Sequence, residues 1–288
     1  MGRKLFLFLS ILSAHLLLSH HLLAQEPIEE LRLTLEQNYP APEGTEAEKA
    51  RLNALAGYLE SREVPTERAP VSTGPTVHTF AEYLLASPRM VNSATLTILV
   101  PVSAPTESLL AGAEAAERSV AKGEPVPVLF LGGSGRDEVG PAWVATRISG
   151  LPGERQVAVL DFDRVERGML VEGGTGGDVT PFYMLQAVRA ISTQELRFGI
   201  AGNRLQLARL GLSVPEQPVG HLLGRGVPAI QIGNATGAGL ARWLSALLFG
   251  DREPVERSIL VERLLKLPAL LPPDAEWERN YAVLQSGP

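Results

Sequence analysis

The sequence predicts an α/β protein with three layers, in which helices cover both faces of a mostly parallel central sheet. From residue 95 onward, short apolar runs alternate with segments of helical periodicity. The runs are continuously apolar, which is typical of strands that are buried on both faces. The chain has no cysteine, so a large buried core, and not disulfide bonds, must stabilise the fold.

The first 24 residues have the pattern of a secretory signal peptide. Arg3 and Lys4 precede an apolar stretch over residues 5–23, and Ala24 offers the small residue that signal peptidase requires. Histidines and serines interrupt this stretch, which makes a stable membrane span costly, although an uncleaved anchor is the alternative. We therefore expect an exported protein, periplasmic or extracellular, with no stable membrane span after cleavage.

About 260 residues remain after cleavage, enough for one α/β domain with a substantial core. We expect this domain over residues 25–270, followed by a C-terminal tail over residues 271–288 that begins in a proline-rich stretch. The net charge is −6, and residues of both signs are interspersed along the chain. Because there is no basic stripe, the sequence does not favour nucleic acid as a partner.

Local patterns predict the elements of this domain in chain order. Residues 28–39 and a segment capped by Thr45, with Glu48 as its capping-box partner, predict two helices. Residues 65–75 predict a loop. Strands are expected over residues 95–100, 126–131, 156–162 and 227–232. Helices are expected over residues 106–122, 141–148, 180–191, 203–210, 239–249 and 255–267.

Three local strings carry a resemblance to a known family. They are Pro42-Glu43-Gly44-Thr45-Glu46-Ala47-Glu48-Lys49-Ala50, Val128-Leu129-Phe130-Leu131 and Gly226-Val227-Pro228-Ala229-Ile230-Gln231-Ile232-Gly233. In this order they resemble the opening helix, the strand before a glutamate pair, and the strand that follows the last metal-binding histidine in the co-catalytic zinc aminopeptidases. That family includes leucyl aminopeptidases, glutamate carboxypeptidase, glutaminyl cyclase and nicastrin-like members. The resemblance implies a zinc-aminopeptidase-like fold with a cleft at the carboxyl ends of its strands.

The resemblance also indicates where zinc ligands would lie, and the first of these positions is changed. Pro101-Val102-Ser103 stands where the family has a histidine and an aspartate, so it supplies no nitrogen ligand. The acidic pair Asp137-Glu138 matches the two adjacent glutamates of the family, one a general base and one a ligand.

The remaining ligand positions are kept only in part. Asp163 matches the next aspartate, and Asp161 takes its place if the match slips by one residue. His221 lies two residues after Val219, where the last histidine is expected. The resemblance thus implies a degenerate form that lacks most zinc ligands and holds no metal or other cofactor. If zinc is bound, the ligands are Glu138, Asp163 and His221.

These changes predict an exported pseudo-peptidase, a catalytically inactive domain that serves as a binding or scaffolding module. Its partner would be a peptide or small ligand, or another envelope protein, because the cleft of such a fold persists without metal. The residues expected at the cleft are Ser103, Asp137, Glu138, Asp163 and His221.

The alternative is an active hydrolase of one of two kinds. One is a metallo-aminopeptidase with a rearranged zinc site, in which Asp137 and Glu138 are the catalytic candidates. The other is a serine hydrolase with Ser134 as nucleophile, followed along the chain by an aspartate and His221. Gly132 fits the nucleophile elbow of such enzymes, but Arg136 occupies the position of its second glycine. The glycines around Ser134 are also consistent with a simple turn, or with a backbone nest that binds an anion.

Overall fold

The computed structural model describes residues 27–73, 76–88, 95–123, 126–134, 139–149, 155–172, 180–200, 218–233 and 252–271. The predicted signal peptide over residues 1–24 lies outside the described residues, as do the predicted helices over 203–210 and 239–249 and all but Leu271 of the predicted tail. Asp137 and Glu138 lie outside them too. Within the described ranges, no helix has the length and hydropathy of a membrane span.

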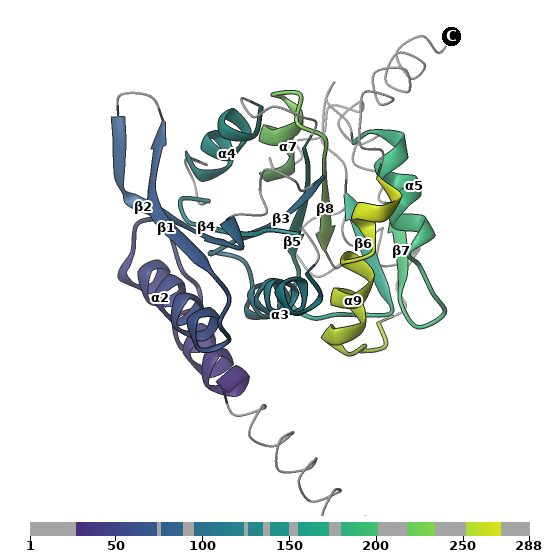
Figure 1. Ribbon diagram of the computed structural model, residues 1–288, viewed down its shortest axis with the longest axis horizontal. Coiled ribbons are helices and arrows are strands. Elements are labelled where there is room, and N and C mark those ends of the chain that lie inside the picture. The colour runs from purple at the N-terminus through teal and green to yellow at the C-terminus, as the bar shows by residue number, and fades with distance from the viewer. Residues whose placement is uncertain are drawn as a thin grey trace, which may run out of the picture.

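The described strands form one mixed sheet with the order β1-β2-β4-β3-β5-β8-β6-β7 (Figure 1). Its strands are β1 (Thr66–Thr73), β2 (Thr76–Ala86), β3 (Leu96–Pro101), β4 (Val128–Leu131), β5 (Gln156–Asp161), β6 (Gly168–Glu172), β7 (Arg197–Ile200) and β8 (Ala229–Gly233). Strands β4, β3, β5 and β8 are parallel to one another and form the centre, whereas β2 and β6 join them in antiparallel pairs. The predicted α/β class with a mostly parallel centre is confirmed.

Helices cover both faces of this sheet (Figure 1). On one face lie α4 (Val139–Ser149) and α7 (Pro218–Leu223). On the other lie α2 (Glu46–Ser61), α3 (Thr106–Lys122), α5 (Phe182–Ala190) and α9 (Arg257–Leu264). A first helix over residues 27–37 packs on this second face, and a 3₁₀ turn (Leu267–Leu270) follows α9.

The central strands are apolar on both sides because their side chains belong to two hydrophobic cores, one on each face of the sheet. In β3, Ile98 and Val100 point into the core under α2 and α3, while Leu99 points into the core under α4 and α7. β4 and β5 alternate in the same way. Each fully buried aliphatic side chain contributes roughly 1.5–3 kcal/mol, so these two cores account for much of the stability of a chain without disulfides.

The prediction of a loop over residues 65–75 is wrong, because residues 66–73 form β1. β1 pairs with β2 in an antiparallel hairpin that the sequence pattern also missed. β1 is an edge strand with exposed Glu67, Arg68 and Pro70, so it lacks the alternating apolar pattern by which buried strands are recognised. The short strands β6 and β7 were also not predicted. In the strand order they lie farthest from β1, with β7 as the second edge strand and β6 beside it.

Candidate functional site

The loops after β4, β3 and β5 meet at one edge of the sheet. These strands are neighbours and run parallel, so the residues that follow Leu131, Pro101 and Asp161 lie at the same, carboxyl edge. Ser134, Ser103 and Asp163 follow these three strands. The structure therefore places two of the residues expected at the cleft, Ser103 and Asp163, at this edge on adjacent loops, together with the candidate nucleophile Ser134.

A buried carboxylate on α2 holds the loop after β4. Only 2% of Glu48 is exposed. The N–H of Gly133 donates to its Oε1 and the N–H of Gly44 donates to its Oε2, both at 2.8 Å. Burial raises the pKa of Glu48, the two N–H donors lower it, and the nearby carboxylates Glu43 and Glu82 raise it further. The anion at this glycine turn is thus supplied by the protein itself.

Only one half of the predicted capping box forms. The hydroxyl of Thr45 accepts a hydrogen bond from the N–H of Glu48 (3.3 Å) and so caps α2, as predicted. The carboxylate of Glu48 does not return to Thr45, because it is bound to Gly44 and Gly133. The capping-box role predicted for Glu48 is therefore replaced by a tertiary contact.

The turn itself requires glycine. A Cβ on Gly132 would lie 2.6 Å from the carbonyl oxygen of Glu82, to which Gly132 also donates its own N–H at 2.9 Å. Gly133 has a φ of +67°, a conformation that favours glycine. Ser134 follows, and its hydroxyl donates to the carbonyl of Leu131 (3.1 Å). The described contacts of Ser134 are those of a turn residue.

A buried arginine holds the loop after β3. Arg51, also on α2, has no exposed surface. Its Nη1 donates to the carbonyls of Val102 (2.5 Å) and Ala104 (2.9 Å), and its guanidinium lies 5.4 Å from the ring centre of Tyr39. Burial lowers the pKa of Arg51 to about 10. The two carbonyls that flank Ser103 are therefore bound to a cation of the protein.

The two aspartates at the end of β5 have different surroundings. Asp161 is the last residue of the strand, and its Oδ2 accepts from Nε2 of Gln231 on β8 (3.1 Å). Gln231 is almost fully buried. Asp163 lies past the strand and is exposed, on the side of the sheet where α3 and α9 pack.

His221 lies at the amino edge of the sheet, opposite the carboxyl edge where the loops after β3, β4 and β5 meet. It is on α7, and the N–H of Val227 donates to the carbonyl of the adjacent Leu222 (2.9 Å), which places this part of α7 beside the amino end of β8. Because β8 is parallel to β5, the structure does not bring His221 to Ser103, Ser134 or Asp163. A side chain from β8 that reaches the carboxyl edge must follow Gly233, and residues 234–251 are not described.

The donors on the described loops do not fit a two-zinc site. The loop after β3 offers the Ser103 hydroxyl, and the described part of the loop after β4 offers that of Ser134. Asp163 supplies a single carboxylate where zinc requires several nitrogen, sulfur or carboxylate ligands together. In the described ranges, no three His, Cys, Asp or Glu side chains are grouped so as to hold a metal ion.

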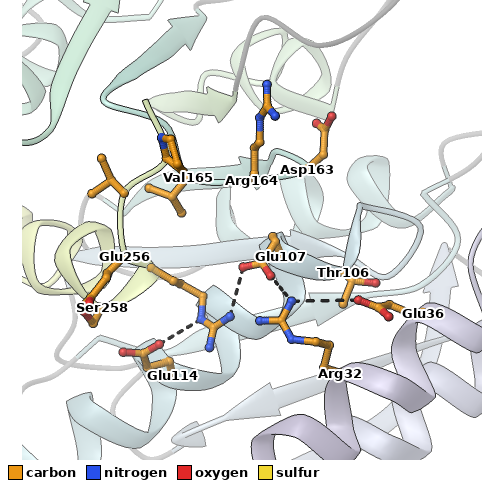
Figure 2. Close-up of a pocket in the computed structure, with 13 residues that line it drawn as sticks. Arg32, Glu36, Thr106, Glu107, Glu114, Asp163, Arg164, Val165, Glu256 and Ser258 are labelled. Atoms are coloured by element: carbon orange, nitrogen blue, oxygen red, sulfur yellow. Dashed lines mark hydrogen bonds and ion pairs between the residues drawn. The ribbon is translucent and has the colours of Figure 1, made fainter. Parts of the chain in front are cut away.

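A groove opens beside Asp163, with a volume of about 680 Å³ (Figure 2). The first helix, the start of α3, the loop after β5 and the segment into α9 form its walls. The residues that line it are Arg32, Glu36, Thr106, Glu107, Glu114, Asp163, Arg164, Val165, Pro254, Val255, Glu256, Arg257 and Ser258. Most of them are charged, so this groove is suited to a polar ligand.

Ion pairs fix the floor of the groove. Glu107 on α3 binds Arg32 of the first helix and, at 3.1 Å, Nη1 of Arg257 on α9. Nε of Arg257 binds Glu114 (3.0 Å), which also binds Arg118 (2.7 Å). Figure 2 shows Glu114, Glu107, Arg32 and Glu36 in a row along this floor, with dashed lines marking the ion pairs. The row joins three helices and keeps the charges of the floor in place.

The chain is similar to solved aminopeptidase structures. It matches the Legionella pneumophila LapA aminopeptidase at 11% identity and a TM-score of 0.54, over 87% of this chain and 70% of that one. It matches a leucine aminopeptidase precursor from Bacteroides thetaiotaomicron at 11% identity and a TM-score of 0.52, over 84% and 96% of the two chains. A Zn-dependent exopeptidase from Parabacteroides distasonis matches at 13% identity and a TM-score of 0.50, over 83% and 97%.

Identities this low show the fold alone, and the chain has an aminopeptidase-like α/β fold. Residues 151–287 also match a family described as TP_0564 family, first domain. No curated protein matches the sequence. The fold expected from the three strings is confirmed, and the chemistry of the site depends on the residues of this chain.

The residues that hold the carboxyl edge were not predicted from the sequence, although a signal for them is present. Glu48, Arg51 and Leu55 share one face of α2 at helical spacing, and all three are buried. A charged residue in the apolar stripe of a helix indicates a buried polar contact. Its partners could not be read from the spacing, since they lie 51 to 85 residues further along the chain.

Proposed function

We propose that this chain is an exported, catalytically inactive domain of aminopeptidase-like fold that binds a peptide or small ligand, or an envelope partner, at the carboxyl edge of its sheet. One observation carries the proposal. Two buried charges on α2, Glu48 and Arg51, fix the backbone of the loops after β4 and β3.

Burying a charge costs several kcal/mol even after relaxation, so such groups are costly ways to hold a loop. In this chain the two buried charges hold two loops at the edge where ligands bind in open α/β sheets. Fixed loops lower the ordering cost of binding, because the site does not have to be organised by the ligand. This favours a preformed recognition surface at the edge.

The same contacts disfavour zinc catalysis at the loop after β3. The resemblance implies a ligand position at Ser103, whereas the carbonyls on either side of it already bind the guanidinium of Arg51. A permanent positive charge beneath this loop repels a divalent cation. The proposal therefore assigns the loop to recognition and not to metal binding.

The test is the metal content of the purified mature protein, measured by mass spectrometry after zinc loading and dialysis, with an aminoacyl-nitroanilide assay on the same sample. We expect well under one zinc ion per chain and no turnover. Close to two tightly held zinc ions together with turnover would overturn the proposal. The mass of the mature chain also tests export, because cleavage after Ala24 removes the first 24 residues.

The serine hydrolase alternative has its own test. The Ser134 hydroxyl donates to a main-chain carbonyl, and His221 lies at the opposite edge of the sheet. We therefore expect no labelling by a fluorophosphonate probe. Labelling that disappears in Ser134→Ala, but persists in Ser103→Ala, would establish the hydrolase instead.

A further inference from the structure

We infer that an apolar strip made of Tyr39, Pro40 and Pro42 belongs to the proposed binding surface and receives an aromatic side chain of a peptide ligand, which stacks on the ring of Tyr39. This role rests on the proposed function and deepens it, because it names a contact residue and the class of ligand side chain. None of the residues considered as zinc ligands or as nucleophile is part of the strip.

The strip is apolar and yet exposed. Tyr39 is 50% exposed, and Pro40 and Pro42 are exposed as well. Ala41 between the two prolines is buried and anchors the segment. Single exposed apolar residues are common on protein surfaces, whereas a contiguous group of them indicates a contact surface. The ring of each proline fixes its φ, so the strip loses little conformational freedom when a ligand binds.

The strip borders the carboxyl edge of the sheet. It lies in the connection between the first helix and α2. At the start of this connection, the ring centre of Tyr39 lies 5.4 Å from the guanidinium of Arg51, which holds the loop after β3. At its end, the N–H of Gly44 and the N–H of Gly133 donate to the same carboxylate, that of Glu48. The connection therefore runs beside the loops after β3 and β4, at the proposed binding surface.

The charges around Tyr39 favour an uncharged ring as its partner. The guanidinium of Arg51 occupies one face of the Tyr39 ring and is fully buried, so a ligand reaches the other face. A second cation on that face would be repelled by Arg51. The nearest carboxylates along the chain are engaged elsewhere, because Glu36 forms an ion pair within the first helix (4.0 Å) and Glu43 lies at the glycine turn after β4. Stacking of an aromatic side chain on the exposed face requires no charge.

Room for the rest of a peptide lies next to the strip. The N–H of Tyr39 donates to the carbonyl of Glu36 (3.2 Å), and Nη2 of Arg51 donates to the hydroxyl of Thr106 (3.5 Å). Glu36 and Thr106 both line the groove of about 680 Å³, and Figure 2 shows them at the same end of it. A peptide whose aromatic side chain lies on Tyr39 can therefore extend into a groove whose polar lining suits its main chain.

The experiment measures fluorescence anisotropy of a labelled, uncharged peptide of phenylalanine, glycine and serine with the full mature protein, in the presence of a chelator. The same peptide with alanine or with lysine in place of phenylalanine serves as ligand control. The test variant is Tyr39→Ala, and Tyr39→Phe keeps the ring. The matched control is Leu33→Ala, which truncates another exposed apolar side chain (57%) of the first helix, outside the strip. Thermal unfolding of each variant verifies that it is folded.

We expect the phenylalanine peptide to bind at least about threefold more tightly than the alanine and lysine peptides. Tyr39→Ala should weaken its binding by about three- to tenfold, the range of one aromatic pair, whereas Tyr39→Phe and Leu33→Ala should change it by less than about twofold. Equal losses in Tyr39→Ala and Leu33→Ala would overturn the role of Tyr39. Equal binding of the three peptides, or no binding of the phenylalanine peptide, would overturn it as well.

Failure of this role and failure of the proposed function are distinguishable. If the phenylalanine peptide binds wild type and Tyr39→Ala equally well, Tyr39 is not a contact residue, while the proposed binding function stands. Zinc with turnover would overturn the proposed function and would leave the anisotropy result unchanged, because that experiment is carried out with zinc removed.

Discussion

Arg51 provides the sharpest test of how the carboxyl edge is held. The change Arg51→Met keeps most of the side-chain volume but removes the donors for the carbonyls of Val102 and Ala104. Each buried carbonyl left without a partner costs about 1–3 kcal/mol, and loss of the contact with Tyr39 adds about 0.5–2 kcal/mol. Removing a buried charge recovers part of this cost. We expect the free energy of unfolding to fall by about 2–4 kcal/mol.

The assay is urea unfolding followed by circular dichroism, supported by thermal unfolding. For a domain of this size the loss corresponds to a decrease in Tm of roughly 4–16 °C. The matched control is Lys49→Met, two residues earlier on the exposed face of α2, where only an ion pair with Glu46 is lost. That change should cost no more than about 0.5 kcal/mol. If Arg51→Met is no less stable than Lys49→Met, the buried arginine does not hold the loop after β3.

Three further predictions concern the buried and crowded positions around α2. Burial raises the pKa of Glu48, so the stability that comes from its protonated form is present below pH 4.5 and is lost as the pH rises. In urea unfolding, the wild type should therefore gain stability relative to Glu48→Gln as the pH falls from 7. Parallel pH profiles of the two proteins would contradict this. Gly132→Ala should lower Tm because its Cβ would meet the carbonyl of Glu82. Gly57→Ala, at a helical site with open space, should raise the free energy of unfolding by about 0.5–1 kcal/mol. Equal changes in the stability of the two variants would refute the crowding at Gly132. Burial and an acidic neighbour raise the pKa of Tyr58 to about 12, so the chain should lose stability between pH 10 and 12. The Tyr58→Phe variant should lose less stability over this range. Tyrosinate absorbance measures the titration, and titration of all tyrosines near pH 10 in the folded chain would refute the prediction.

Most of the fold could be predicted from local patterns, because the apolar residues of each central strand show that the strand is buried. Strands β3, β4, β5 and β8 are buried on both faces, so each is apolar along its whole length. The helices over residues 27–37, 106–122 and 139–149 were likewise found from their periodicity and end signals. The three strings led to an aminopeptidase-like fold, which the similar structures confirm.

The edge strands could not be predicted in this way. β1 contains Glu67, Arg68 and Pro70, and it becomes a strand only because β2 pairs with it. Register and pairing of an exposed strand depend on the partner, and the sequence of the strand alone carries little of that information.

The site depended even more on tertiary structure. Residue types and order led to the expectation that Ser103 and Asp163 share a cleft, and both follow strands whose parallel arrangement aligns their carboxyl ends. Order alone also grouped His221 with them, whereas the structure places it beside the amino end of β8. A position before a strand and a position after it look alike in a spacing argument, but they lie at opposite edges of the sheet.

The sequence by itself determined the layers, the central strands and the absence of disulfides, since these follow from where apolar residues and cysteines stand along the chain. Only the tertiary structure decided which charges are buried and what they bind. Glu48 and Gly133 are 85 residues apart, and Arg257 lies 150 residues from Glu107. Such pairs form because the packing of helices on the sheet removes their water, and each charge then needs the partner that the fold brings to it.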